Sequence, residues 1–118
     1  MYHVQFPPQS NRASWVFIGL VTDLDDNPID LSLCPMVFVV RDKNGRVLEA
    51  STTLGGGNGK LTIVALGTFR WFFTLQDMQG FCPGQCDTGL TLTNDDGTQT
   101  VQLSVGPLPI VDGVVPAT

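Results

Sequence analysis

The sequence predicts an all-β protein, a β-sandwich of about seven strands, on two observations. Short runs rich in β-branched and aromatic residues recur at a spacing of about 8–12 residues, and clusters of Gly, Pro, Asn and Asp separate them. The 3.6-residue apolar period of a helix is missing, apart from one possible helical turn within 74–80.

The chain divides into one sandwich and two extended arms. Residues 1–13 form the N-terminal arm, in which Pro7 and Pro8 forbid a helix. Residues 106–118 form the C-terminal arm, which is apolar and interrupted by prolines. The sandwich spans the residues between them, with strands expected at 14–23, 34–42, 46–52, 60–65, 67–75, 85–93 and 98–105.

Turn residues lie where these strands must be joined. Asn44-Gly45 predicts a type I′ hairpin turn between the second and third strands, because both residues tolerate positive φ. The residues 24–28 and 94–97 have turn compositions, and the glycine-rich residues 55–59 predict a flexible loop.

Three of the predicted strands, the first, second and fifth, are apolar on both faces. In the first strand Trp15 and Phe17 point to one side, while Val16 and Ile18 point to the other. In the fifth strand Phe72 occupies the second face. The sixth and seventh strands instead alternate between apolar and polar residues, as expected for strands with one face in water.

We expect the first, second and fifth strands to share one sheet of an immunoglobulin-like sandwich. The outer face of that sheet would then be apolar, and monomers rarely expose much such surface. Either the chain's own arms or a partner protein covers it. The interface residues predicted on this basis are Tyr2, Val4, Phe6, Val16, Ile18, Phe72, Leu108, Ile110 and Val111.

The composition excludes several classes of function. The chain has 118 residues, a formal net charge of −5 and only 6 Lys and Arg, which excludes a basic nucleic-acid-binding surface. Charged residues make up 14%, below the roughly 25% of soluble domains, which indicates a covered surface. No apolar run approaches the roughly 20 residues that span a bilayer, and we expect no membrane contact. The three cysteines indicate synthesis in a reducing cytoplasm.

The sequence offers little catalytic or cofactor-binding chemistry. His3 is the single histidine and lies in an arm, so we expect no enzyme, no metal and no cofactor. Cys82 and Cys86 have the spacing of half a zinc site, but free thiols are the favoured interpretation and a disulfide between them is an alternative. The acidic residues 23–30 are interpreted as turn residues rather than a calcium site, and Trp15 and Trp71 as core or interface residues rather than a sugar platform.

The order of several motifs carries a family resemblance over residues 14 to about 106. These motifs are Ser14-Trp15-Val16-Phe17, the turn with Asp23, Asp25, Pro28, Asp30 and Leu31, the segment Val40-Arg41-Asp42 with Gly45, the pair Pro83-Gly84, the hairpin with Leu92, Thr93, Asp96 and Gly97, and the strand with Val101, Leu103 and Val105. Together they resemble the immunoglobulin-like modules of tailed-phage tail and baseplate proteins, and are similar to the N-terminal domain of siphophage upper-baseplate proteins. Cys86 and Leu90 depart from that pattern, since a tyrosine pair commonly follows the Pro-Gly.

The resemblance implies attachment and assembly rather than catalysis. We therefore expect a multi-copy structural virion protein of the tail, baseplate or tail-fibre base, made in the bacterial host cytoplasm. Its partners would be other virion proteins and copies of itself. One alternative is a decoration or fibre-base protein of the head or neck. Another is a receptor- or carbohydrate-binding module that uses its loops, which are poor in aromatic residues.

Overall fold

The computed structural model describes residues 2–3, 6–22, 25–52, 57–81, 83–94 and 98–111, with the backbone alone for residues 2–3. Strands and a single short helix follow one another along these residues. They are β1 (Tyr2–His3), β2 (Gln9–Ser10), β3 (Trp15–Leu20), β4 (Met36–Arg41), β5 (Val47–Ser51), β6 (Leu61–Ala65), β7 (Thr68–Phe73), α1 (Leu75–Gln79), β8 (Gly84–Thr93) and β9 (Thr100–Val111).

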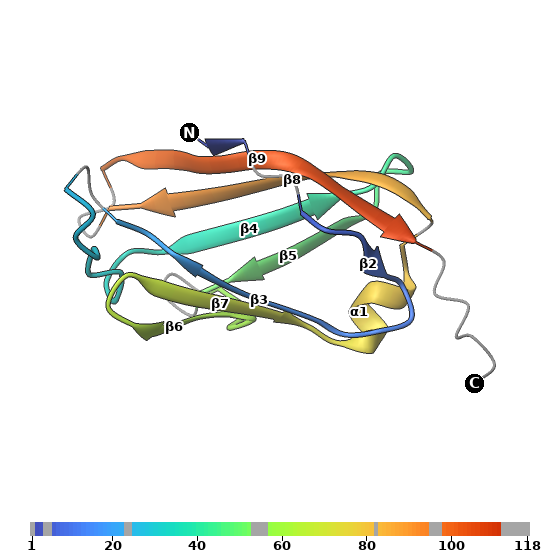
Figure 1. Cartoon of the computed structure of the whole chain (residues 1–118), viewed down its shortest axis with the longest axis horizontal. Helices are drawn as coiled ribbons and strands as arrows, with labels where there is room; N and C mark the ends of the chain where they lie inside the picture. Colours follow the sequence, from blue (N-terminus) through green and yellow to red (C-terminus); the bar gives the residue numbers. More distant parts are fainter. Residues whose placement is uncertain are drawn as a thin grey trace.

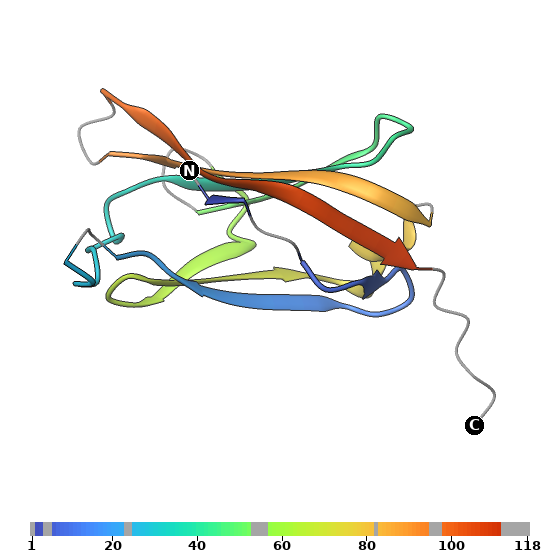
Figure 2. The same ribbon diagram turned by 45° about the horizontal axis from the view of Figure 1, so that its top comes forward.

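The strands form two facing sheets, which confirms the predicted all-β sandwich (Figure 1). The larger sheet has the order β1-β9-β8-β4-β5, and β2 also pairs with β9. The smaller sheet has the order β3-β7-β6. Figure 2 shows the two layers closer to edge-on.

The strand order is that of an immunoglobulin sandwich. The smaller sheet has the order of strands B, E and D, and β9-β8-β4-β5 has the order of strands G, F, C and C′. The prediction that the first, second and fifth strands share one sheet was wrong, because β4 lies in the larger sheet with β5, β8 and β9. Side-chain alternation shows which faces of a strand are apolar, but it does not show which strands are neighbours.

The N-terminal arm is part of the larger sheet. β1 pairs in parallel with β9 through Tyr2↔Ser104 and His3↔Val105, and β2 does so through Gln9↔Ile110 and Ser10↔Val111. The arm therefore covers the outer flank of β9. Between β1 and β2, the N–H of Phe6 donates to the carbonyl of Pro107 at 3.3 Å.

β9 is longer than predicted. It continues without interruption to Val111, so the boundary expected at residue 105 was wrong and residues 106–111 belong to the sandwich. A register shift at Leu103 also changes which residues face inward, since Ser104, expected on the polar face, is buried. A bulge of this kind reverses the alternation of the residues after it. Residues 112–118, the remainder of the predicted C-terminal arm, lie outside the described residues.

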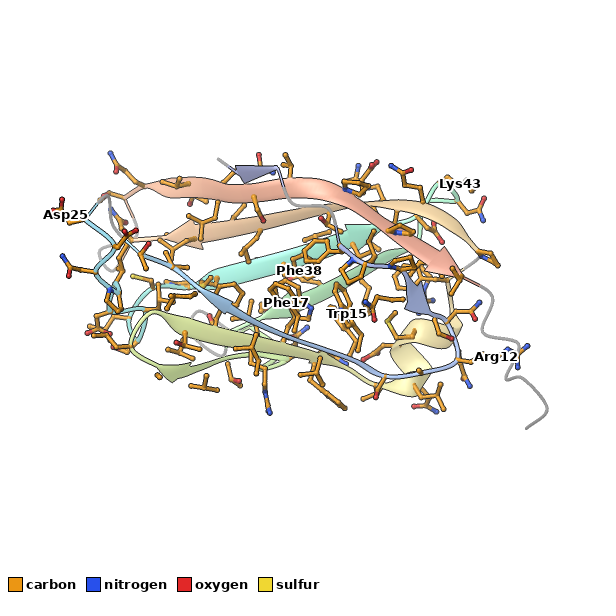
Figure 3. All side chains as sticks on the ribbon, in the orientation of Figure 1. Arg12, Trp15, Phe17, Asp25, Phe38 and Lys43 are labelled. Carbon is orange, nitrogen blue, oxygen red and sulfur yellow. The ribbon has the colours of Figure 1, made fainter. Side chains whose placement is uncertain are left out.

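The core between the sheets is centred on aromatic rings. Phe38 of β4 stacks on Trp71 of β7 with ring centroids 3.7 Å apart, and Phe17 of β3 stacks on the same indole at 4.5 Å. Phe6 enters this cluster from the arm and meets Trp15 edge-on at 5.5 Å. Figure 3 shows Trp15, Phe17 and Phe38 near the middle of the molecule, between the layers. These ring contacts fix the N-terminal arm and the strands β3, β4 and β7 to one another.

The hairpin between β4 and β5 differs from the predicted type I′ turn. Gly45 has a positive φ of 86°, whereas Asn44 does not. The N–H of Gly45 donates to the carbonyl of Asp42, and the N–H of Asp42 donates to the carbonyl of Arg46. This is a three-residue loop with glycine in the left-handed position.

The helical turn expected within 74–80 is confirmed as α1. Thr74 is its N-cap, with a capping box in which Thr74 and Asp77 bond to each other's backbone N–H. No helix in the part of the chain that the structure describes is long and apolar enough to cross a membrane.

Candidate interaction surface

The smaller sheet turns an apolar surface toward solvent. Successive residues of β3 alternate, so that Trp15 and Phe17 face the core while Ile18 and Leu20 are 62% and 61% exposed. Phe72 on β7 lies directly opposite Val16 and is 40% exposed. We call this surface the outer apolar face and define it as Val16, Ile18, Leu20, Val64, Leu66 and Phe72.

The polar residues of this sheet are few. Arg70 of β7 lies opposite Ile18 on one side and Thr62 on the other, and Thr68 lies opposite Leu20. Arg70 is the one charged residue within β3, β6 and β7, all of whose residues are described. Single exposed apolar residues are normal on a protein surface, but a sheet face with this many of them and one charged residue is informative.

Three predicted interface residues, Val16, Ile18 and Phe72, belong to the outer apolar face. Their facing was correctly predicted from the alternation of β3 and β7. The predicted list lacked Leu20, Val64 and Leu66. The alternation of side chains could have identified Leu20 if it had been followed to the end of β3, and Val64 if it had been applied to residues 60–65. Leu66 lies in the turn between β6 and β7, where alternation gives no signal.

The predicted interface residues of the two arms do not belong to the outer apolar face. Phe6, Leu108 and Ile110 are buried in the chain's own core, so their assignment to contacts with neighbouring molecules was wrong. Leu108 and Ile110 are buried because β9 continues through residues 106–111 and its even-numbered side chains there point between the sheets. Phe6 is buried because its ring packs on Trp15, Phe17 and Phe38. Val111 is exposed at the end of β9, the backbone of Tyr2 pairs with Ser104, and Val4 lies outside the described residues.

β3 forms one flank of the smaller sheet, and its backbone on that side is unpaired among the described residues. The N–H of Val21 donates to the carbonyl of Gly67 at 2.7 Å, which fixes the bonding phase of this antiparallel pair. Bonded and outward-directed residues alternate along such a ladder. The N–H and C=O groups of Val16, Ile18 and Leu20 therefore point away from β7.

A cavity of about 300 Å³ opens beside this flank, between β3 and β9. Its lining includes Phe17 and Gly19 on one side and Leu103 and Ser104 on the other. Gly19 allows the ring of Phe69 to cross the strand, because a Cβ at this position would lie 2.3 Å from Cζ of that ring. The cavity is mostly apolar and reaches the aromatic core.

Trp71 lines the same cavity and contributes an unsatisfied polar atom. The residue is 1% exposed, and its Nε1 has no hydrogen-bond partner among the described residues. Buried donors without an acceptor are rare in folded proteins. The cavity therefore contains a hydrogen-bond donor that no acceptor in the described part of the chain pairs with.

The cysteines show no reactive arrangement. Cys86 is a free, buried thiol, and burial, together with the charges of Asp42 and Asp87, raises its pKa to about 11. Such a thiol is a poor nucleophile and a poor metal ligand. Cys82, the other cysteine of the alternative Cys82–Cys86 disulfide, lies outside the described residues.

The acidic turn after β3 uses its carboxylates within the chain. Asp30 Oδ1 accepts a hydrogen bond from the N–H of Ser32 at 3.0 Å, and this bond lowers the pKa of Asp30. Asp25 and Asn27 also make interactions of their own, while Asp23 lies outside the described residues. Within the described ranges, no group of three or more His, Cys, Asp or Glu side chains is placed to hold a metal ion.

Comparison with known proteins adds no relative: no protein-family model matches the chain, and no curated protein matches its sequence.

Proposed function

We propose that this chain is a non-enzymatic structural protein of a tailed-phage particle, present in many copies, which docks its outer apolar face onto neighbouring subunits. The single observation that carries the docking proposal is the exposure of six large apolar side chains on or beside the three-stranded sheet. A concentration of exposed apolar side chains on one sheet marks a protein contact site more often than singly scattered ones do.

The charge pattern supports a protein partner over other ligands. The net charge of −5 opposes binding to nucleic acid, and the charged residues beside the outer apolar face are Arg70 and Lys60, of which Lys60 is ion-paired with Asp77. Interfaces are depleted of charge at their centre and enriched in aromatic and Arg side chains. Phe72 lies directly opposite Val16 and two residues along β7 from Arg70, so the face combines these two side-chain types.

The assignment to a tailed-phage particle rests on the sequence motifs given above. The immunoglobulin-like strand order is the fold that the resemblance implies, and it supports the assignment without selecting a location in the particle. Tail, baseplate and tail-fibre base are our first choice. Imaging of particles labelled with an antibody against this chain tests it, because label on the head or neck alone would contradict this location.

Substitution of Phe72 by Asp tests docking by the outer apolar face. Phe72→Asp places a charge on the face, so the mass of the wild-type assembly in size exclusion with light scattering should shift to smaller species. Val47→Asp is the control, since Val47 is an apolar residue that is 52% exposed, against 40% for Phe72, but lies on β5 of the other sheet, and it should leave the mass unchanged.

Circular dichroism establishes that both variants remain folded. Val64→Asp is a second test on the same face, on β6, and should behave as Phe72→Asp does. The proposal fails if the wild-type chain is monomeric at high concentration and in the presence of its particle proteins. It also fails if Val47→Asp disrupts the assembly as much as the two face variants do.

A further inference from the structure

The flanks of the two sheets are protected unequally. On the outer flank of β5, the side chain of Asn58 accepts from the N–H of Ser51 at 2.9 Å and donates to the carbonyl of Glu49 at 2.7 Å. β6 is irregular, with a register shift between Ile63 and Ala65. A side chain that occupies the edge groups and a bulge are both known means of preventing strand addition.

β9 is protected twice. β1 and β2 cover its flank, and Pro107 and Pro109 have no N–H to offer. The carbonyl of Pro107 accepts from Phe6 on this flank, and that of Val111 accepts from Asn11, so the odd-numbered residues face the arm. At Pro107 and Pro109, therefore, the flank of β9 that faces the arm has no backbone N–H that an added strand could bind.

β3 has none of these protections. Its six residues, Trp15–Leu20, pair with β7 in unbroken register and include no charged residue and no proline. The residues whose backbone groups point outward, Val16, Ile18 and Leu20, are also exposed apolar residues. A regular, uncharged, apolar edge is a template for another strand.

We propose that β3 accepts an added β-strand, and that the strand is supplied by residues 112–118 of a second copy of this chain. The inference deepens the proposed function, on which its assembly role rests. In an immunoglobulin sandwich, strand A occupies the flank of strand B, and β3 has the place of strand B. An added strand would therefore complete the smaller sheet beside the cavity.

The length and composition of residues 112–118 identify them as the donor. β3 is about 20 Å long at roughly 3.3 Å per residue. Seven extended residues cover that length, and every other stretch outside the described residues is four residues or fewer. The segment carries one charge, at Asp112, and an apolar pair, Val114-Val115.

The apolar pair matches the two surfaces beside β3. Successive side chains of a strand point to opposite faces. One valine of the pair would enter the 300 Å³ cavity lined by Phe17 and Gly19, and the other would extend the outer apolar face. Phe6 is a precedent within the same chain, since its arm adds to the flank of β9 and its ring enters the core.

A complementation experiment tests the proposal with full-length chains. Val114→Asp combined with Val115→Asp disables the donor, and Ile18→Pro disables the acceptor. The N–H of Ile18 points away from β7, so the proline removes no bond within the chain, and prolines are tolerated on such edges. Neither variant should add strands alone. Their mixture should contain a heterodimer by light scattering, because one intact acceptor meets one intact donor.

Amide exchange identifies the contact. In ¹⁵N-labelled donor-disabled chain, the amides of Val16, Ile18 and Leu20 should exchange at least ten-fold more slowly after addition of unlabelled Ile18→Pro chain. The amides of Trp15 and Phe17, already bonded to β7, should not change. The matched control is an unlabelled chain with Ile18→Pro, Val114→Asp and Val115→Asp together, which should give no protection.

Three results would overturn the proposal: no heterodimer, a heterodimer without protection of these three amides, or equal protection by the control chain. Phe72→Asp in both partners should leave the heterodimer intact, because Phe72 lies on the face and not on the flank. If Phe72→Asp dissolves the large assemblies while the three amides stay unprotected in the wild-type assembly, the proposed function stands and strand addition is wrong. If the three amides are protected in the wild-type assembly while Phe72→Asp leaves the large assemblies intact, strand addition stands and docking by the outer apolar face is wrong.

Discussion

Asp42 determines the shape of the hairpin between β4 and β5. Its Oδ1 accepts from the N–H of Asn44 at 2.9 Å and from the N–H of Arg46 at 2.8 Å, and the residue is buried. In a type I′ turn the N–H of Arg46 would instead donate to the carbonyl of Lys43, so the carboxylate of Asp42 takes the bond that would define the tight turn. Asn-Gly in the sequence therefore indicated a hairpin correctly, while the neighbouring aspartate selected the turn type.

Asp42→Ala should lower the free energy of unfolding by about 1–3 kcal/mol, because two backbone donors lose their acceptor. Asp42→Asn retains an oxygen in the same position and should lose less. Urea unfolding followed by tryptophan fluorescence measures both. Equal losses in the two variants would show that the negative charge, rather than the acceptor oxygen, stabilises the loop.

At the scale of one element, α1 depends on Asp77. Burial alone would raise the pKa of Asp77, but hydrogen bonds from Lys60 and Thr74 outweigh it and lower the pKa below 3.8. The carboxylate accepts from the N–H of Thr74 at 3.0 Å and forms an ion pair with Lys60. The same side chain thus starts the helix and joins it to the residue that precedes β6.

Asp77→Asn should lower the free energy of unfolding by about 1 kcal/mol at pH 7, through loss of the capping carboxylate and the ion pair. Because the folded-state pKa is lowered, this contribution is complete above the unfolded-state value of 3.8 and is lost as pH falls through the folded-state value. The difference between variant and wild type should therefore shrink steadily as pH falls below 3.8. A difference in urea unfolding that stays constant as pH falls would contradict the role of the charged form.

The strands illustrate how far sequence reasoning reaches. The positions of β3, β4 and β7 and the outward side chains Val16, Ile18 and Phe72 followed from alternation, because burial imposes a two-residue period on any strand. The inward residues at the end of β9 did not follow, since one bulge at Leu103 changes the phase and leaves no signature in composition. The hydrogen bonds between Asn58 and the edge of β5 could not be predicted from the sequence either, because they depend on one side chain of a loop that lies beside the strand.

At the scale of the whole molecule, Phe6 links the arm to both sheets. Its ring contacts Trp15 and Phe17 of the smaller sheet and Phe38 of the larger one. The residue is 4% exposed. The sequence could not predict this, because an isolated aromatic residue directly before two prolines is typical of an extended arm and not of a core.

Phe6→Ala should lower the free energy of unfolding by about 3–5 kcal/mol, the usual cost of truncating a buried phenylalanine. Phe72→Ala is the matched control, with the same chemical change on the outer apolar face, and should cost the isolated chain far less. Urea unfolding at low protein concentration compares the two. A loss at Phe6 no larger than that at Phe72 would show that the arm is dispensable for the fold.

The pairing of the arm with β9 also has a consequence for biosynthesis. Among the strands of the sandwich, β1 and β2 leave the ribosome first and pair with β9, which is made last, so the larger sheet cannot be completed while the domain is being translated. Contacts between such distant parts of a chain slow folding. Until β9 emerges, β1 and β2 lack the strand with which they pair, and neighbouring nascent chains on one message are the copies best placed to mispair with them.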